Sequence, residues 1–138
     1  MVKIQNFKYH ERGLNRFFGP LEAKIMNILW NGSSMTIKDV QAKLEEDKTL
    51  NFNTVMTVMN RLVDKDMLTK KTIGRTTLFQ PSVSKDHFLE NQSKELTHEL
   101  IEEFGALVVN HMLDALEEVD EDLLAKLEQK IKMLKKDN

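Results

Sequence analysis

Residues 51–81 read NFNTVMTVMNRLVDKDMLTKKTIGRTTLFQP, and within this stretch the spacing of the apolar residues changes. Over about 52–65 they recur at helical intervals, which predicts an amphipathic helix with Asn51 as its N-terminal cap. The inner face of this helix would be Val55, Val58 or Met59, and Leu62. The opposite face carries mostly short polar side chains: Asn53, Thr54, Thr57, Asn60, Arg61 and Asp64.

The second part of the stretch predicts a β-hairpin. Residues 67–71 and 76–80 read as two short strands, whose apolar content is Leu68, Leu78 and Phe79. Ile73-Gly74 would form the turn between them, and Pro81 would end the unit.

Two more helices are predicted upstream of the polar helix. The first opens at Gly19-Pro20, because proline suits the first turn of a helix, and closes at Asn31-Gly32. The second opens at Thr36, three residues before Asp39, which matches an N-terminal capping pattern. Three helices followed by a hairpin over 19–82 predict a winged helix-turn-helix domain. Residues 1–18 show no clean period and predict a loosely ordered arm that packs some of its aromatic residues.

The chain after residue 82 is predicted to be helical. Ser84 can cap a long helix and Asp120 a last one, in which four apolar residues are spaced three, four and three positions apart. Two such helices cannot bury their apolar stripes against each other alone, and a second copy of the chain is the simplest partner. The fold class is therefore mainly α with a small hairpin, organised as an arm (1–18), a winged-helix domain (19–82) and a helical dimerisation domain (83–138).

Composition places this chain among soluble globular proteins. It has 138 residues, 41% hydrophobic residues and a formal net charge of −2. The charge is unevenly distributed: residues 1–82 hold thirteen Lys and Arg against eight Asp and Glu, whereas residues 83–138 hold seven against fourteen. The first part is thus +5 and the second −7, which suggests a polyanion-binding part joined to an assembly part. No apolar run approaches the length of a membrane span or of a signal peptide, so a cytoplasmic location is expected.

Several segments, in order, resemble the penicillinase-repressor family (BlaI/MecI/CopY) of bacterial transcriptional repressors. GPLEAKIM at 19–26 with Leu29-Trp30 is similar to the family's opening, and TVMTVMNRL at 54–62 resembles its recognition helix. KDML at 65–68, Gly74-Arg75 and FQP at 79–81 resemble its wing. The resemblance implies a dimeric repressor that binds an inverted-repeat operator near genes for antibiotic resistance or, in one branch, copper handling.

The predicted DNA interface follows from how a helix reads the major groove, where bases offer donors, acceptors and thymine methyl groups. Asn53, Thr54 and Thr57 lie near the N-terminal end of the third helix, with Asn60 and Arg61 one turn further on. Arg75 at the hairpin turn could contact phosphate or enter the minor groove. Further phosphate contacts would come from Lys38, Lys43, Lys70 and Lys71.

The predicted dimer interface consists of apolar residues from the helical half of the chain: Leu96, Leu100, Phe104, Val108, Met112, Leu124, Leu127 and Ile131. For each of them, a place in an intramolecular core is the alternative.

Two departures from the family narrow its implications. The copper branch uses a cysteine-rich C-terminal metal site, and this chain has no cysteine, which excludes copper sensing of that kind. The antibiotic-resistance branch is inactivated by a membrane-bound protease that cuts an Asn-Phe bond early in the dimerisation domain. Here the Asn-Phe pairs are Asn6-Phe7 and Asn51-Phe52, and neither lies in the predicted dimerisation domain, so that regulatory partner would need a different site.

Other chemistries find little support in the sequence. The four histidines include no pair at close ligand spacing, and Glu102 stands where the second histidine of an HExxH motif would follow His98. No glycine-rich phosphate loop or nucleophile–base set is visible, so neither an enzyme nor a cofactor is expected. The alternative to a repressor is a winged-helix module that binds a protein and no DNA.

Overall fold

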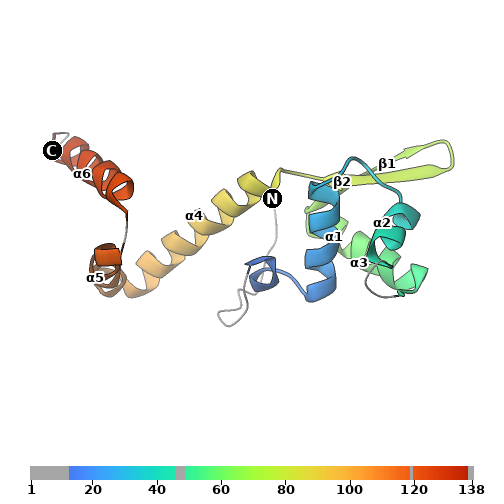
Figure 1. Cartoon of the computed structure of the whole chain (residues 1–138), viewed down its shortest axis with the longest axis horizontal. Coiled ribbons are helices and arrows are strands. Elements are labelled where there is room, and N and C mark those ends of the chain that lie inside the picture. Colours follow the sequence, from blue (N-terminus) through green and yellow to red (C-terminus); the bar gives the residue numbers. More distant parts are fainter. Residues whose placement is uncertain (1–12, 46–48, 119, 137–138) are drawn as a thin grey trace. The chain divides into compact units, whose positions relative to one another are not determined.

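The computed structural model describes residues 13–45, 49–118 and 120–136, which fall into two compact units, Met1–Phe88 and Leu89–Asn138. The first unit holds α1 (Pro20–Trp30), α2 (Ile37–Leu44), α3 (Phe52–Asp64) and an antiparallel hairpin of β1 (Leu68–Ile73) and β2 (Thr76–Pro81) (Figure 1). This order is the predicted winged helix, and the fold class is confirmed. The predicted boundary at residues 82/83 precedes the division between the units by six residues, because Phe88 packs in the first unit's core.

Local capping explains where the helices of the first unit begin. Thr36 and Asp39 form the predicted capping box: the Thr36 hydroxyl oxygen accepts from the Asp39 N–H at 3.1 Å, and the Asp39 carboxylate accepts from the Thr36 N–H at 3.0 Å. Asn51 caps α3 by accepting from the Asn53 N–H at 2.7 Å. Both sequence-based predictions of caps are confirmed, as is Pro20 at the start of α1.

The hairpin differs from its prediction by one residue at the turn. Ile73 pairs with Thr76, so Gly74-Arg75 forms the two-residue turn in place of Ile73-Gly74. Gly74 has a φ of 63°, a left-handed value that glycine adopts without strain and that suits the twist of a tight hairpin. A short bridge also joins Met35 to Phe79, through mutual hydrogen bonds of 3.0 and 2.8 Å. This bridge ties the α1–α2 connection to β2.

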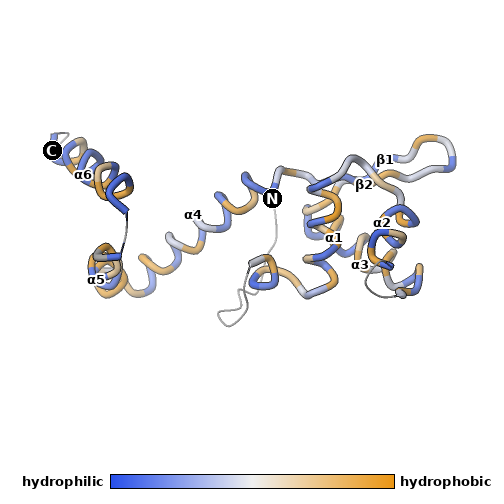
Figure 2. The backbone as a smooth tube through the Cα atoms, viewed as in Figure 1, coloured by the Kyte–Doolittle hydropathy of each residue, from blue (hydrophilic) through white to orange (hydrophobic). Residues whose placement is uncertain are grey.

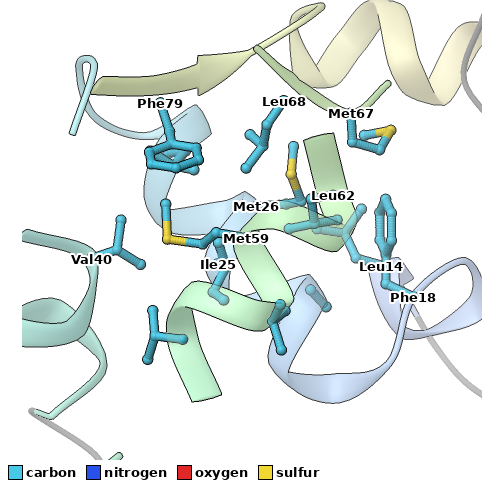
Figure 3. Close-up of a cluster of buried hydrophobic side chains, with 14 of the residues drawn as sticks. Leu14, Phe18, Ile25, Met26, Val40, Met59, Leu62, Met67, Leu68 and Phe79 are labelled. Carbon is cyan, nitrogen blue, oxygen red and sulfur yellow. The ribbon is translucent and has the colours of Figure 1, made fainter. Parts of the chain in front are cut away.

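One hydrophobic core lies between the three helices and the hairpin, and Figure 3 shows its central side chains. The predicted inner face of α3 is confirmed, since Val55, Val58, Met59 and Leu62 are all buried. The remaining buried hydrophobic residues come from the other elements of the unit and from the two segments that flank it: Leu14, Phe18, Ala23, Ile25, Met26, Leu29, Val40, Leu44, Met67, Leu68, Phe79 and Phe88.

Part of the predicted N-terminal arm takes part in the fold of the first unit. Residues 1–12 lie outside the described residues, but Gly13–Arg16 forms a short 3₁₀ helix and Phe18 is 1% exposed. The rings of Phe17 and Phe18 contact Phe88 at centroid distances of 5.5 and 5.4 Å. The expectation of a loosely ordered arm is therefore wrong for 13–18, where Leu14 and Phe18 are buried in the core although Gly13 and Arg16 are exposed. The expected packing of aromatic residues is confirmed for Phe17 and Phe18.

The second unit is helical, as predicted, but it has one more break than the sequence suggested. The chain forms α4 (Lys85–Phe104), α5 (Ala106–Ala115), a 3₁₀ turn at Leu116–Glu118 and α6 (Glu121–Lys136). Gly105 separates α4 from α5 with φ 54° and ψ −121°, a conformation outside the helical region, so the predicted single helix is wrong. Ser84 and Asp120 cap as predicted, accepting from the backbone N–H groups of His87 and Leu123. No helix in the described parts of the chain is long and apolar enough to cross a membrane.

Candidate nucleic-acid interface

One face of α3 carries polar side chains along the length of the helix. Asn53, Thr54, Thr57 and Arg61 are exposed, and Asn60 is half-buried. The opposite face of the same helix is buried in the core, which fixes the helix's rotation about its axis and turns these side chains outward. The structure thus places the five residues predicted for the third helix on one accessible surface.

Two hydrogen bonds organise this polar face. The Thr57 hydroxyl donates to the backbone carbonyl of Asn53, one turn earlier, at 2.8 Å. The Lys70 ammonium, on β1, donates to the Asn60 side-chain oxygen at 3.3 Å. The second bond brings the hairpin and α3 together, so the helix face and the first strand of the wing form one continuous polar surface.

The wing adds positive charge at its turn and along its first strand. Arg75 occupies the turn and is exposed, as is Lys71. Side chains alternate along a strand, and Lys70 pairs with the buried Phe79 whereas Lys71 pairs with Leu78. Lys70 and Lys71 therefore project from opposite faces of the hairpin, and Lys70 lies on the face that hydrogen-bonds to α3.

The two lysines predicted to contact phosphates from the second helix lie at opposite ends of α2. Lys38 lies in the first turn of α2 and Lys43 in its last, and both are exposed. Neither has a hydrogen bond to the polar face of α3 that the structure records, so the structure does not bring them into the network of that face.

Two features near the wing were missed by sequence reasoning. The Ser34 hydroxyl donates to the Gln80 side-chain oxygen at 3.1 Å, across 46 positions of sequence, and no local pattern announces such a contact. Ile73, read as a turn residue, is instead the last residue of β1 and is 57% exposed. The position of Ile73 beside the turn could have indicated its exposure, because a strand residue next to a two-residue turn lies far from the hydrophobic core.

The residues predicted for the dimer interface lie on the three helices of the second unit. Leu96, Leu100, Val108 and Leu124 are half-buried, whereas Phe104, Met112, Leu127 and Ile131 are exposed. Figure 2 shows hydrophobic residues recurring along α4, α5 and α6. Further exposed hydrophobic side chains that sequence reasoning left out of the interface are Leu89, Ile101, Leu107, Val109, Leu113, Leu123, Met133 and Leu134.

Metal-binding arrangements are not found in the described ranges, where no group of three or more His, Cys, Asp or Glu side chains could hold an ion. His98 and Glu102 approach to 3.4 Å on α4, but both side chains are exposed and they are one turn apart on the same helix.

Comparison with known proteins gives matches over both units. The family model described as penicillinase repressor matches residues 18–133. A penicillinase repressor of Bacillus licheniformis is 25% identical over 92 residues, which cover 67% of this chain and 69% of that protein.

Among solved structures, the DNA-binding domain of the repressor BlaI is 24% identical, with a TM-score of 0.48, and the match covers 62% of this chain and 90% of that one. The monomeric form of Bacillus licheniformis BlaI, solved in complex with the blaP half-operator, is 23% identical with a TM-score of 0.46, over 62% of this chain and 92% of that one.

Proposed function

The chain belongs to the penicillinase repressor family, and from this premise we propose that it is a transcriptional repressor that binds operator DNA as a homodimer. The observation that carries the proposal is the outward polar face of α3, joined to the wing by the bond between Lys70 and Asn60. A buried apolar face opposite to it would be enough to hold the helix, so the polar residues are free to serve recognition.

The proposed mechanism divides reading from positioning. The N-terminal half of α3 enters the major groove, where Asn53, Thr54 and Thr57 meet base edges. Arg61 and Asn60 lie one turn on, within reach of a base or a phosphate. Phosphate contacts that set the register of the domain come from the wing and from α2: Lys38, Lys43, Lys70, Lys71 and Arg75.

The dimer supplies the length of the site. One recognition helix reads only a few base pairs, so two domains related by a two-fold axis read an inverted repeat. In the proposal, the exposed apolar residues of α4, α5 and α6 form the contact between the copies. Because the two domains bind as linked modules, loss of the dimer would lower operator affinity without any change at the DNA surface.

The regulated genes are proposed to serve antibiotic resistance or a related stress response, as in the family, and the protein would act in the cytoplasm on that DNA. The chain's own residues leave the family's proteolytic switch without its usual site, since no Asn-Phe bond occurs after residue 82. A membrane protease encoded beside the gene would restore that route of induction through a different cut.

A competition gel shift tests the proposal against the alternative of a protein-binding module. The full chain should select an inverted-repeat duplex over scrambled DNA. Affinity should fall steeply with salt, by about 10³–10⁵ between roughly 50 and 200 mM if some six to ten phosphates are contacted. Equal binding to all duplexes, or none, would contradict the proposed function.

A further inference from the structure

The Thr57 side chain is exposed on the reading face of α3, yet its hydroxyl hydrogen is already in use. The oxygen lies 2.8 Å from the backbone carbonyl of Asn53, to which the hydroxyl donates. A threonine hydroxyl has a single hydrogen, so this bond leaves only oxygen lone pairs and the methyl group for a ligand. Thr57 therefore meets DNA as an acceptor and an apolar group, and donates nothing.

The edges of the base pairs in the major groove respond differently to such a side chain. Guanine presents two acceptors, N7 and O6, which cannot pair with another acceptor. Cytosine presents a donor but no methyl group. Among the base pairs only A·T presents a methyl group, the 5-methyl group of thymine, for contact with the Thr57 methyl group. The N6 amino group of its adenine is a donor, so it does not repel the hydroxyl oxygen.

In the neighbouring Asn60, the protein's own hydrogen bond uses the acceptor of the side chain and leaves its donors available. Its side-chain oxygen accepts from the Lys70 ammonium at 3.3 Å, and its amide nitrogen keeps two hydrogens to donate. Two residues three positions apart on the same helix thus offer different chemistry to the groove: donor N–H groups at Asn60 and a methyl group at Thr57. The difference arises from their hydrogen bonds within the protein.

We propose that Thr57 reads a thymine in each half-site through contact between its methyl group and the thymine 5-methyl group, while its hydroxyl serves to fix the side-chain rotamer. This inference rests on the proposed function and names a specificity determinant within it. The back-bond to Asn53 holds the methyl group in one orientation, so that little side-chain freedom is lost when DNA binds.

Two conservative variants separate the methyl group from the hydroxyl. Thr57→Val keeps a methyl group in place and removes the hydroxyl, whereas Thr57→Ser keeps the hydroxyl and removes the methyl group. The preferred duplex is first selected with the full-length wild-type chain from randomised DNA. Each thymine of the half-site is then replaced, one at a time and symmetrically, by deoxyuridine, which lacks only the 5-methyl group.

The wild type should be weakened at one thymine position by about fourfold per half-site, the value expected for one buried methyl group. Thr57→Val should bind within about twofold of the wild type and keep this deoxyuridine penalty. Thr57→Ser should bind about fourfold more weakly per half-site and lose the penalty at that position. Melting temperatures of both variants serve as the folding control.

Two results would overturn the inference while leaving the proposed function intact. One is a selected operator to which Thr57→Val binds poorly and Thr57→Ser binds normally, which would assign reading to the hydroxyl. The other is a wild-type protein that is insensitive to deoxyuridine at every thymine. Failure of the wild type to select any duplex would instead contradict the proposed function itself.

Discussion

The two units of this chain bury their hydrophobic residues in opposite ways. The first unit encloses its large apolar side chains, so that Phe18, Ile25 and Leu62 are almost inaccessible to water. In the second unit, α5 and α6 have no buried residue among those described, and Leu107 is 61% exposed. The winged helix buries most of its own hydrophobic surface, whereas the helical unit leaves large apolar side chains exposed, as the proposed dimer would require.

The largest effect is expected when a charge is placed on the apolar surface proposed as the dimer interface. Leu127→Asp, or Leu100→Asp, should give monomers, because an aspartate cannot be buried unpaired between two copies. Operator affinity should then fall by about 10²–10⁴, since the two DNA-binding domains are no longer linked. Sedimentation and gel shifts on the same samples measure both effects.

Gln129→Asp is the matched control for this experiment, because it adds the same charge to an exposed polar position of α6. It should leave the dimer and the affinity unchanged. A dimer that persists in Leu127→Asp and in Leu100→Asp would remove these residues from the interface.

Two phenylalanines of α4 test the contrast within a single helix. Phe88 is 1% exposed and contacts the rings of Phe17, Phe18 and Trp30, whereas Phe104 is 48% exposed. Phe88→Ala should lower the free energy of unfolding of the first unit by about 3–5 kcal/mol at any protein concentration. Phe104→Ala should act only through association, so its effect should grow as the protein is diluted.

Urea denaturation followed by circular dichroism at two concentrations, differing about a hundredfold, distinguishes these outcomes. Similar effects of Phe88→Ala and Phe104→Ala at both concentrations would mean that the two parts of α4 are buried alike, and the contrast between the units would fail.

A substitution on the polar face of α3 tests whether the exposed residues of the first unit serve DNA binding and contribute little to stability. Arg61→Ala removes an exposed side chain, so it should leave the melting temperature nearly unchanged but weaken operator binding by about 1–3 kcal/mol. Lys24→Ala, at an exposed position of α1 outside the proposed interface, is the control of equal charge. If both variants lose affinity equally, general electrostatic attraction explains the binding and α3 has no special role.

The smallest expected effect concerns a cap within the first unit. Thr36→Ala removes the hydroxyl that accepts from the Asp39 N–H and should cost about 1 kcal/mol of stability. Thr36→Ser keeps that oxygen and should restore most of the loss. Thermal unfolding of the three proteins measures this, and an alanine variant as stable as the wild type would show that water replaces the cap.

Features set by neighbours in sequence were predictable here. The caps at Thr36, Asn51 and Asp120 each depend on residues two or three positions away, and all three were identified from the sequence. The inner face of α3 was also predictable, because its period of apolar residues is regular. The outward face that the structure gives to Asn53 and Thr57 follows from that same period.

Two kinds of feature were not predictable: contacts between distant parts of the chain, and local features that depend on one backbone angle or one side-chain rotamer. The bridge between Met35 and Phe79, and the packing of Phe18 on Phe88, join segments that no periodicity relates. Gly105 stands inside an apolar stripe that continues past it, so its left-handed backbone left no trace in the pattern. The hydrogen bond of Thr57 to Asn53 depends on a rotamer, and helical spacing permits that bond without requiring it.

The chain contains a single tryptophan, Trp30, and its environment has an optical consequence. Its indole N–H donates to the Val83 carbonyl at 2.9 Å, and its ring lies 5.6 Å from that of Phe88, within the aromatic cluster of the first unit. Intrinsic fluorescence excited at the indole band therefore reports on the winged helix alone. The helical unit is silent in this signal, and the protein carries a built-in label that separates the melting of its two parts.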